Sequence, residues 1–425
     1  MRKHTDVSAE RFILSREFFG MKLGLKNIGE FLESIGSPQQ QYPTIHIAGT
    51  NGKGSTAAML AAILRAEGYK TGLFTSPHLI TLRERVRVNG RMISKPSLTG
   101  FVNRHRRELT RRQLSFFEVV TAMAFDYFRR AKVDVAVIET GLGGRLDATN
   151  TLQPILTLTT EISRDHVEIL GQSLPKIARE KAGIIKSRVP HLIGHLPDSA
   201  EKVIRDTCRK REAPLQKLLL KDYRLYPNEM AFTYTGNGLA GKKLTTSLPG
   251  VHQLKNAALA VKAIAVLKGQ NMAVSGEAVR DGLLQTDWPG RFQIIRRRGH
   301  PTVILDVAHN TTGVRAFVDS FRLVFPDRKA KVITGFVKRK EHQKMLDSLA
   351  LIAEEYLVVP LRSRRGTDVK ALMAEINWRE IPHRSIGSLV TACRRVRKLC
   401  QSDDIIVVIG SHFLVGEYLD KNGLI

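Results

Sequence analysis

The sequence predicts an α/β protein of two domains, a larger N-terminal one with a P-loop-type turn and a smaller, Rossmann-like C-terminal one. A short β-rich run at residues 42–48 leads into GTNGKGS and then into a helical pattern that ends at Gly68. Residues 133–140, VDVAVIET, form the continuous apolar run that is typical of a buried parallel strand. After residue 293, strands and helices alternate again, which indicates a second α/β sheet.

The individual elements follow from the same patterns. In the first domain we expect strands at 42–48, 71–74 and 133–140, and helices at 55–68, 116–130, 252–268 and 276–284. Residues 222–247 alternate between polar and apolar side chains, which predicts a small antiparallel excursion. In the second domain we expect strands near 302–306, 331–334, 355–359 and 404–409. The domains are predicted to cover 1–297 and 298–425, because RRRGHP at 296–301 is a charged stretch with Gly and Pro, suited to an exposed hinge.

Length and composition exclude several classes of protein. The chain has 425 residues, of which 43% are apolar and 25% charged, so it can form full cores and is not disordered as a whole. No apolar run reaches the roughly 18 to 20 residues that a spanning helix needs, and the N-terminal residues lack a secretory pattern. Three cysteines without CxxC spacing indicate reduced thiols. We therefore expect a cytoplasmic protein that has no membrane partner.

The net charge of +27 predicts acidic partners. The basic residues form short clusters at 104–107, 296–298 and 362–365, without interleaved aromatic residues or a nucleic-acid motif. Nucleic acid is therefore disfavoured as a partner. A basic surface also gathers small anionic substrates and ATP. We expect a monomer whose partners are small molecules.

The loop GTNGKGS, Gly49 to Ser55, predicts a phosphate site. Backbone N–H groups at a glycine turn before a helix can surround phosphate oxygens, and Lys53 adds a positive charge. The loop departs from the general P-loop pattern, because its first glycine lies three residues before Gly52 instead of five, and Gly54 separates Lys53 from the hydroxyl residue. The predicted phosphate-binding residues are Asn51, Gly52, Lys53, Gly54 and Ser55.

Several motifs in order give the chain a resemblance to a known family. They are GTNGKGS, FTSPHL (74–79), SFFE (115–118), TGLGGRLDATN (140–150), DHVEILG (165–171), EKAGIIK (180–186), PGVHQLKNAALA (249–260), PGRFQ (289–293), DVAHN (306–310) and GSHFLVGE (410–417). With these motifs the sequence resembles the folylpolyglutamate synthase and dihydrofolate synthase branch of the Mur ligases. The cell-wall Mur ligases typically carry GKT in the loop and lack the SPHL and GGRLDATN segments.

The resemblance implies a magnesium site. Glu139 ends a buried strand, where a carboxylate can bind Mg²⁺ or form a salt bridge. The resemblance implies that Ser76, Glu139 and His166 bind metal, although alone Ser76 is compatible with a turn and His166 with a helix start. Lys181 lies among apolar residues, which lowers the pKa of an amine and lets its neutral form react with carbon dioxide. In the similar ligases the matching lysine is carbamylated, so we expect a metal-binding carbamate at Lys181 and two Mg²⁺ sites; the alternative is a surface lysine paired with Glu180.

The resemblance also implies substrate and nucleotide residues. The segments that hold the pteroate group match Ser115, Phe116, Phe117, Glu118, Leu146, Asp147 and Ala148, although both phenylalanines can equally be core residues. The positions that contact ATP between the two domains match Asn256, Arg291, Asp306 and His309. A guanidinium at Arg291 would neutralise phosphate charge in the transition state. The expected catalytic residues are Lys53, Lys181, His166 and Arg291.

The predicted function is an ATP-dependent ligase that joins L-glutamate to dihydropteroate, to reduced folates, or to both, through an acyl phosphate. Two alternatives stay open. One is a Mur-type amide ligase that acts on a different acid. The other, suggested by the charge of +27, is a nucleic-acid-binding protein that uses ATP as a switch.

Overall fold

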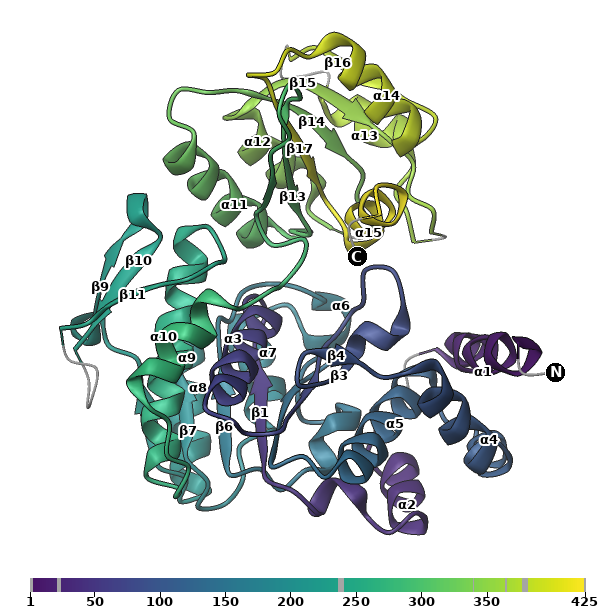
Figure 1. Cartoon of the computed structure of the whole chain (residues 1–425), viewed down its shortest axis with the longest axis vertical. Coiled ribbons are helices and arrows are strands. Elements are labelled where there is room, and N and C mark those ends of the chain that lie inside the picture. The colour runs from purple at the N-terminus through teal and green to yellow at the C-terminus, as the bar shows by residue number, and fades with distance from the viewer. Residues whose placement is uncertain are drawn as a thin grey trace. The chain divides into compact units, whose positions relative to one another are not determined.

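The computed structural model of the chain describes residues 3–20, 24–235, 241–338, 340–363, 365–376 and 381–423. Two compact units make up the chain (Figure 1). Unit 1 comprises Met1–Arg224, Thr233–Leu244 and Asn256–Thr286, and unit 2 comprises Leu225–Phe232, Thr245–Lys255 and Asp287–Ile425.

Unit 1 contains an eight-stranded mixed sheet in the order β4-β3-β2-β5-β1-β6-β7-β8. Its strands are β1 (Thr44–Ala48), β2 (Thr71–Phe74), β3 (Val86–Val88), β4 (Arg91–Met92), β5 (Val135–Glu139), β6 (Leu156–Thr159), β7 (His191–Ile193) and β8 (Leu215–Lys217). The strands from β2 to β8 in this order pair in parallel, and β3 and β4 are antiparallel additions at one edge. The central strands β1 and β5 are buried at every position, which explains the apolar run of β5 up to Glu139; in β1 the buried residues include the polar Thr44 and His46.

The helices of unit 1 connect and cover these strands. They are α1 (Lys3–Ser15), α2 (Lys26–Ser34), α3 (Lys53–Ala66), α4 (Lys95–Arg111), α5 (Phe116–Ala131), α6 (Val167–Leu170), α7 (Leu174–Ala182), α8 (Asp198–Lys210) and α10 (Gly276–Leu284), with 3-10 turns η1 (Arg16–Phe19), η2 (Pro38–Gln40), η3 (Leu82–Arg85), η4 (Ala148–Thr151) and η5 (Leu220–Asp222). Helix α3 is apolar around most of its circumference because eleven consecutive residues, Gly54 to Leu64, are buried. This burial fixes the helix that follows the glycine loop.

The stretch of sequence at residues 223–268, which follows the strands of the large sheet and precedes those of the six-stranded sheet, contributes residues to both units. It contains β9 (Tyr223–Tyr226), the turn η6 (Pro227–Glu229), β10 (Ala231–Tyr234), β11 (Lys243–Thr245) and helix α9 (Val251–Lys268). The three strands form their own sheet in the order β11-β10-β9, in the region where the alternating pattern predicts an excursion.

Unit 2 contains a six-stranded sheet in the order β12-β13-β17-β14-β15-β16. Its strands are β12 (Gln293–Ile295), β13 (Thr302–Asp306), β14 (Ala330–Thr334), β15 (Ala353–Val358), β16 (His383–Ser385) and β17 (Ile405–Ile409). Its helices are α11 (Thr311–Val324), α12 (His342–Ala350), α13 (Val369–Ile376), α14 (Leu389–Leu399) and α15 (His412–Lys421). Helices α11 and α12 cover one face of the sheet, and α14 and α15 cover the other (Figure 1).

The structure gives residues 296–301 a different setting from the hinge expected in the sequence. Strand β12 pairs antiparallel with β13, with Ile295 opposite Val303, so these residues form the turn of a hairpin inside unit 2. The change between the compact units falls at Thr286 to Asp287, before the expected boundary at 297/298. Charged residues, glycine and proline are typical of a surface turn as well as of a hinge between domains. Strand β12, just before this turn, is too short to show a strand periodicity in the sequence, so the sequence does not predict the hairpin.

The predicted α/β fold class, with a large mixed sheet and a smaller C-terminal α/β sheet, is confirmed. Among the helices of the described residues, none combines the length and apolar composition needed to span a bilayer.

Candidate active site

The phosphate loop connects β1 to α3 at the carboxyl edge of the large sheet. Gly49 and Gly52 both have positive φ values, of 153° and 84°. A Cβ atom on Gly49 would lie 1.9 Å from Oγ1 of Thr160, and one on Gly52 would lie 2.5 Å from Oδ1 of Asn256. Both positions therefore require glycine. The second contact places Asn256, on α9, beside the loop.

Neighbouring residues hold the loop in shape. The Thr50 amide donates to the Glu161 carbonyl at 2.6 Å, and Thr160 Oγ1 donates to the Asn51 carbonyl at 2.7 Å. Ser55 is buried in the first turn of α3, so its hydroxyl lies at the helix N-terminus. Helix N-termini favour anions because their first N–H groups have no partner within the helix.

Lys53 lies over this loop and faces a carboxylate. Its Nζ atom donates to the carbonyls of Gly49 and Thr50 at 3.1 and 3.0 Å, and lies 3.9 Å from Oε1 of Glu139. Glu139 is buried at the end of β5, and its Oε2 atom accepts a 2.9 Å hydrogen bond from the Ser76 amide. The structure thus brings together Lys53, Glu139 and Ser76 from three different motifs.

Lys181 contacts the same loop. It is on α7 and fully enclosed, and its Nζ atom donates to the Gly49 carbonyl at 2.6 Å. Burial, with a further contribution from the charge of Lys53, lowers the pKa of Lys181 to about 7, although Asp165, Asp147 and Glu161 act in the opposite direction. The alternative of an exposed lysine paired with Glu180 does not hold, because Glu180 forms its ion pair with Arg145.

His166 differs from the buried Glu139 and Lys181 in the exposure of its side chain. It precedes the short helix α6 with a positive φ of 49°, and its side chain is 45% exposed. Its backbone amide donates to Oδ1 of Asp165 at 2.8 Å. The structure therefore places its backbone at a tight turn and leaves its imidazole accessible.

The predicted pteroate segments lie at helix starts. Ser115 and Glu118 form a buried capping box at the N-terminus of α5. Asp147 caps η4 and is buried, where its carboxylate accepts hydrogen bonds from the amides of Leu142 and Thr149. Burial raises the pKa of Asp147, and these hydrogen bonds oppose the shift. Leu146 is half-buried and Ala148 buried on either side of it.

Phe116 and Phe117 are half-buried and pack against the core of unit 1, so the core role that the sequence left open applies to both. Phe117 lies against Gly141, where a Cβ atom would come within 2.3 Å of its ring. Phe116 carries the guanidinium of Arg85 over its face, at 5.1 Å from the ring centre. This edge of the sheet therefore offers an aromatic surface with a cation above it.

A second cluster of predicted residues lies in unit 2, at the carboxyl end of β13. The buried Asp306 carboxylate accepts hydrogen bonds from the amides of Phe292 and Ala308 at 2.8 and 2.7 Å. Burial raises the pKa of Asp306 to about 6, and the charge of Arg291 opposes the shift. His309 donates from Nδ1 to the Val307 carbonyl at 2.9 Å when that nitrogen carries the proton. Arg291, Asp306 and His309 thus form one local group.

Three charged residues near the glycine loop and the aromatic surface are not among the residues predicted from the sequence: Arg85, Asp165 and Glu161. Arg85 is buried and donates from Nε to Nδ1 of His78 at 2.9 Å; burial lowers its pKa to about 10, against the charges of Glu139 and other carboxylates. Asp165 and Glu161 are the acidic neighbours of Lys181. Asp165 belongs to the recognised DHVEILG segment, whereas the burial of Arg85 depends on tertiary packing that has no local signal.

The carboxylate of Glu139 and its neighbours fit a divalent cation that is bound mainly through nucleotide phosphates. Within the described ranges, no group of three or more His, Cys, Asp or Glu side chains could enclose a metal ion. Mg²⁺ commonly uses one or two carboxylates together with substrate phosphates and water. Glu139, next to Ser76 and the glycine loop, supplies one such carboxylate.

Comparisons with known proteins identify the class. The model of the Mur ligase middle domain matches residues 47–264, and that of the Mur ligase glutamate ligase domain matches residues 290–412. The chain therefore belongs to the Mur ligase family, as the glycine loop and the two α/β sheets indicate.

Individual relatives specify the branch. A dihydrofolate synthase/folylpolyglutamate synthase of Bacillus subtilis is 35% identical over 96% of this chain and 97% of its own length. A bifunctional folylpolyglutamate synthase/dihydrofolate synthase with Mn, AMPPNP and L-glutamate bound aligns with a TM-score of 0.84, at 31% identity over 97% of each chain. The Escherichia coli enzyme in complex with DHPP and ADP aligns with a TM-score of 0.85, at 29% identity over 98% of this chain and 97% of its own. Within the Mur ligases, the chain belongs to the folylpolyglutamate synthase/dihydrofolate synthase family.

Proposed function

We propose that the protein is an ATP-dependent ligase that joins L-glutamate to dihydropteroate and to reduced folates. The observation that carries this conclusion is the full-length membership of the family, together with the glycine loop on which Lys53 and Lys181 converge. ATP and a divalent cation are its cofactors, in keeping with the AMPPNP and Mn bound to a relative. The reaction class is amide-bond formation between a carboxylate and an amine.

The proposed reaction has two stages. The substrate carboxylate attacks the γ-phosphate of ATP, which gives an acyl phosphate and ADP. The amine of L-glutamate then attacks the acyl carbon, and inorganic phosphate leaves as the amide forms. Catalysis of such transfers depends mainly on positioning and on stabilisation of charge.

The residues of unit 1 supply these two effects. Backbone amides of residues 51–55 and the ammonium of Lys53 bind the phosphates, since the loop ends at a helix N-terminus. When bound, the divalent cation supplies additional positive charge at the transferring phosphoryl group. Glu139 and Ser76 would hold that cation, together with His166 and a carbamate on Lys181.

The acid substrate is assigned to the segments at the starts of α5 and η4. Phe116 and Phe117 provide an aromatic surface for a planar ring, and the buried Asp147 provides a hydrogen-bonding carboxylate. Ser115 and Glu118 hold the end of α5 in place through their capping box, and Leu146 and Ala148 flank Asp147. In unit 2, Arg291, Asp306 and His309 are assigned to ATP, as is Asn256 in unit 1.

The carbamate on Lys181 is supported by the burial of its amine. A pKa of about 7 leaves a large fraction of the amine neutral at physiological pH, and the neutral form is the one that reacts with carbon dioxide. We expect Lys181→Ala to lose most ligase activity and to regain part of it in excess acetate, which places carboxylate oxygens in the vacated space. Full activity of this variant without acetate would contradict the carbamate. Lys176→Ala, on an exposed face of the same helix, is the matched control.

Transfer of isotope tests the acyl phosphate directly. When the substrate carboxylate carries ¹⁸O, one labelled oxygen should appear in the inorganic phosphate that is released, because the acid oxygen that attacked ATP leaves with the phosphoryl group. Unlabelled phosphate throughout turnover would rule out this intermediate. Mass spectrometry of the organic product would at the same time show whether glutamate has been added.

Three finer assignments complete the proposal. Two magnesium sites are proposed, with Glu139 and the Lys181 carbamate as their main anionic protein groups. A monomer with small-molecule partners is proposed, with nucleic acid disfavoured as a partner. A cytoplasmic location is supported by the three cysteines, Cys208, Cys393 and Cys400, which are all free thiols.

A further inference from the structure

Unit 2 has a cavity of about 100 Å³ that none of the assigned residues line. Its floor is a row of paired apolar residues on three adjacent strands, Ile295 of β12, Val303 of β13 and Ile406 of β17. Helices α14 and α15 contribute Cys393 and Tyr418 to its sides. Ile295 and Val303 are only half-buried, so the helices leave this part of the sheet face partly uncovered.

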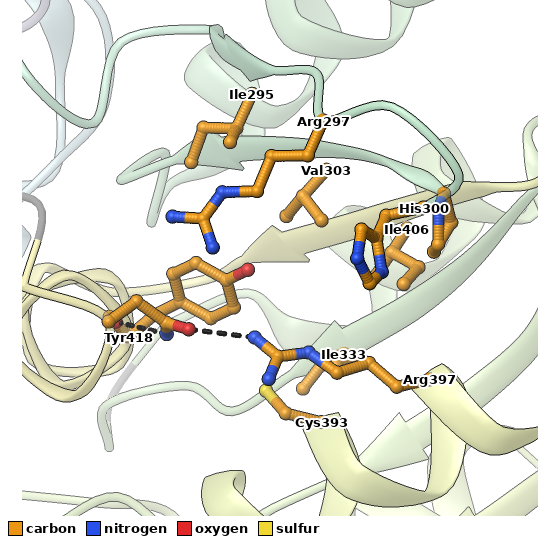
Figure 2. A pocket seen from close by; sticks show the side chains of 11 residues that line it. Ile295, Arg297, His300, Val303, Ile333, Cys393, Arg397, Ile406 and Tyr418 are labelled. Carbon is orange, nitrogen blue, oxygen red and sulfur yellow. Dashed lines mark hydrogen bonds between the residues drawn. The ribbon is translucent and has the colours of Figure 1, made fainter. Parts of the chain in front are cut away.

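The mouth of this cavity is positively charged. Arg297 and His300 come from the hairpin turn at 296–301, and Arg397 comes from α14. Figure 2 shows the two guanidinium groups on opposite sides of the Tyr418 ring, with the His300 ring directed into the same space. None of the described lining residues is acidic.

Both arginines are available for an anion. Both side chains are exposed, and among the ion pairs of the described residues none involves Arg297 or Arg397, whereas the exposed Arg362 and Arg384 elsewhere in unit 2 face Glu417 and Glu355. Arg397 is held in place by a 2.7 Å hydrogen bond from Nη2 to Oδ1 of Asn422. Burial and the neighbouring Cys393 raise the pKa of Tyr418, whereas a hydrogen bond and the charge of Arg397, together with the charge of Arg297, oppose the shift.

We propose that this cavity, with Ile295, Val303 and Ile406 as its floor and Arg297 and Arg397 at its mouth, binds a small organic anion with a compact apolar body. An enclosed cavity of about 150 Å³ in another protein accommodates benzene, so this smaller space of about 100 Å³ suits a branched alkyl group or one ring that projects partly through the mouth. The anionic group, a carboxylate or a phosphate monoester, lies between the two guanidinium groups, which donate charge-assisted hydrogen bonds. Tyr418 and His300 offer further donors.

The location makes this site distinct from the candidate active site. Val303 and Ile406 are the second residues of the parallel strands β13 and β17, and Asp306 is at the other end of β13. Three residues of a strand span about 10 Å, so the cavity lies on the sheet face away from the carboxyl edge that carries Asp306. The proposal does not depend on the ligase reaction.

The test uses the full chain with methyl-labelled isoleucine and observes Ile295 and Ile406 by NMR during titration. The probes are benzoate, phenyl phosphate, the neutral isostere benzamide and inorganic phosphate, each up to about 10 mM, a range suited to dissociation constants near 1 mM. We expect benzoate or phenyl phosphate to shift both methyl signals, and benzamide and inorganic phosphate to bind at least about tenfold more weakly. Tighter binding of benzoate would identify a carboxylate ligand, and tighter binding of phenyl phosphate a phosphate ester.

Matched double variants distinguish binding in this cavity from a general effect of the protein's positive charge. Arg297→Ala/Arg397→Ala should weaken binding of the organic anion at least about tenfold, because two charge-assisted hydrogen bonds are lost. Arg298→Ala/Arg394→Ala removes the same charge from the same turn and helix, but these exposed residues do not line the cavity, so binding should be retained. Equal binding to both double variants, displacement of benzoate by ADP or L-glutamate, or absence of shifts at Ile295 and Ile406 would each overturn the proposal.

Discussion

Replacement of Lys181 by methionine should change how stability depends on pH. In the native protein the Lys181 amine is enclosed, and burial lowers its pKa from 10.5 to about 7. In the unfolded chain the same amine is in water and regains its ordinary pKa. Between pH 7 and 10.5 unfolding therefore takes up a proton at Lys181, so the free energy of unfolding rises with pH across this window.

The size of the effect follows from this shift. Differential binding of one full proton changes the free energy of unfolding by about 1.4 kcal/mol per pH unit. Because the amine is half-titrated at each end of the window, the change between pH 7 and 10.5 is about 4 kcal/mol. Lys181→Met keeps a side chain of similar length and removes the titration. The Gly49 carbonyl keeps a donor in the variant, because Lys53 also donates to it at 3.1 Å. At pH 7 the variant should accordingly be more stable than the wild type, by an amount below about 4 kcal/mol.

The assay is denaturant unfolding of both proteins between pH 7 and 9.5 in buffer depleted of carbon dioxide, which keeps the amine unmodified. The stability difference between the two proteins should shrink as pH rises, since all other titrating groups are common to both. Lys176→Met, from an exposed position on α7, should run parallel to the wild type at every pH. Parallel curves for Lys181→Met and the wild type would refute the inference that Lys181 is held neutral by burial.

Three further substitutions test the nucleotide residues. Lys53→Ala should lower kcat about 10²- to 10³-fold while the fold persists, and near-native ADP release would remove the loop from the phosphate assignment. Gly52→Ala forces a Cβ atom to within 2.5 Å of Asn256 at a φ of 84°. The variant should therefore have a higher KM for ATP and a free energy of unfolding lower by about 1 to 2 kcal/mol. An unchanged KM and thermal midpoint would argue against this loop geometry. Asp306→Ala leaves the amides of Phe292 and Ala308 without their acceptor, so calorimetry should show weaker ATP binding, and unaltered affinity would count against the role of Asp306.

The sequence predicts most of the main fold because its central elements carry strong local signals. Strand β5 is an apolar run up to Glu139, β1 is a short β-rich run that leads into the glycine loop, and α3 begins directly after that loop, so their places follow from residue pattern and turn chemistry. Short edge strands give no such signal. Strand β12 has only three residues, and none of them is fully buried. The sequence therefore gives no strand pattern there, and β12 is recognised only through its antiparallel pairing with β13 in the structure.

Some residues of the candidate site could likewise be predicted from the sequence, and some of its contacts could not. Gly49, Lys53 and Glu139 occur at the ends of predicted elements, where the carboxyl edge of a parallel sheet collects functional groups. The hydrogen bond from Lys181 to the Gly49 carbonyl joins residues 132 positions apart, and no local pattern encodes it. The burial of Arg85 over Phe116 likewise depends on packing between distant segments.

The most direct test of the ligase function is steady-state ADP release by the purified protein with Mg²⁺ and ATP. Dihydropteroate and tetrahydrofolate are each supplied with and without L-glutamate, and ligase activity predicts sustained ADP release only when an acid acceptor and L-glutamate are both present. Release with both acceptors would show both activities, and release with one acceptor would show a single activity. ADP release that ignores both acids, or that is stimulated by DNA or RNA instead, would contradict the assignment as a glutamate ligase of folates.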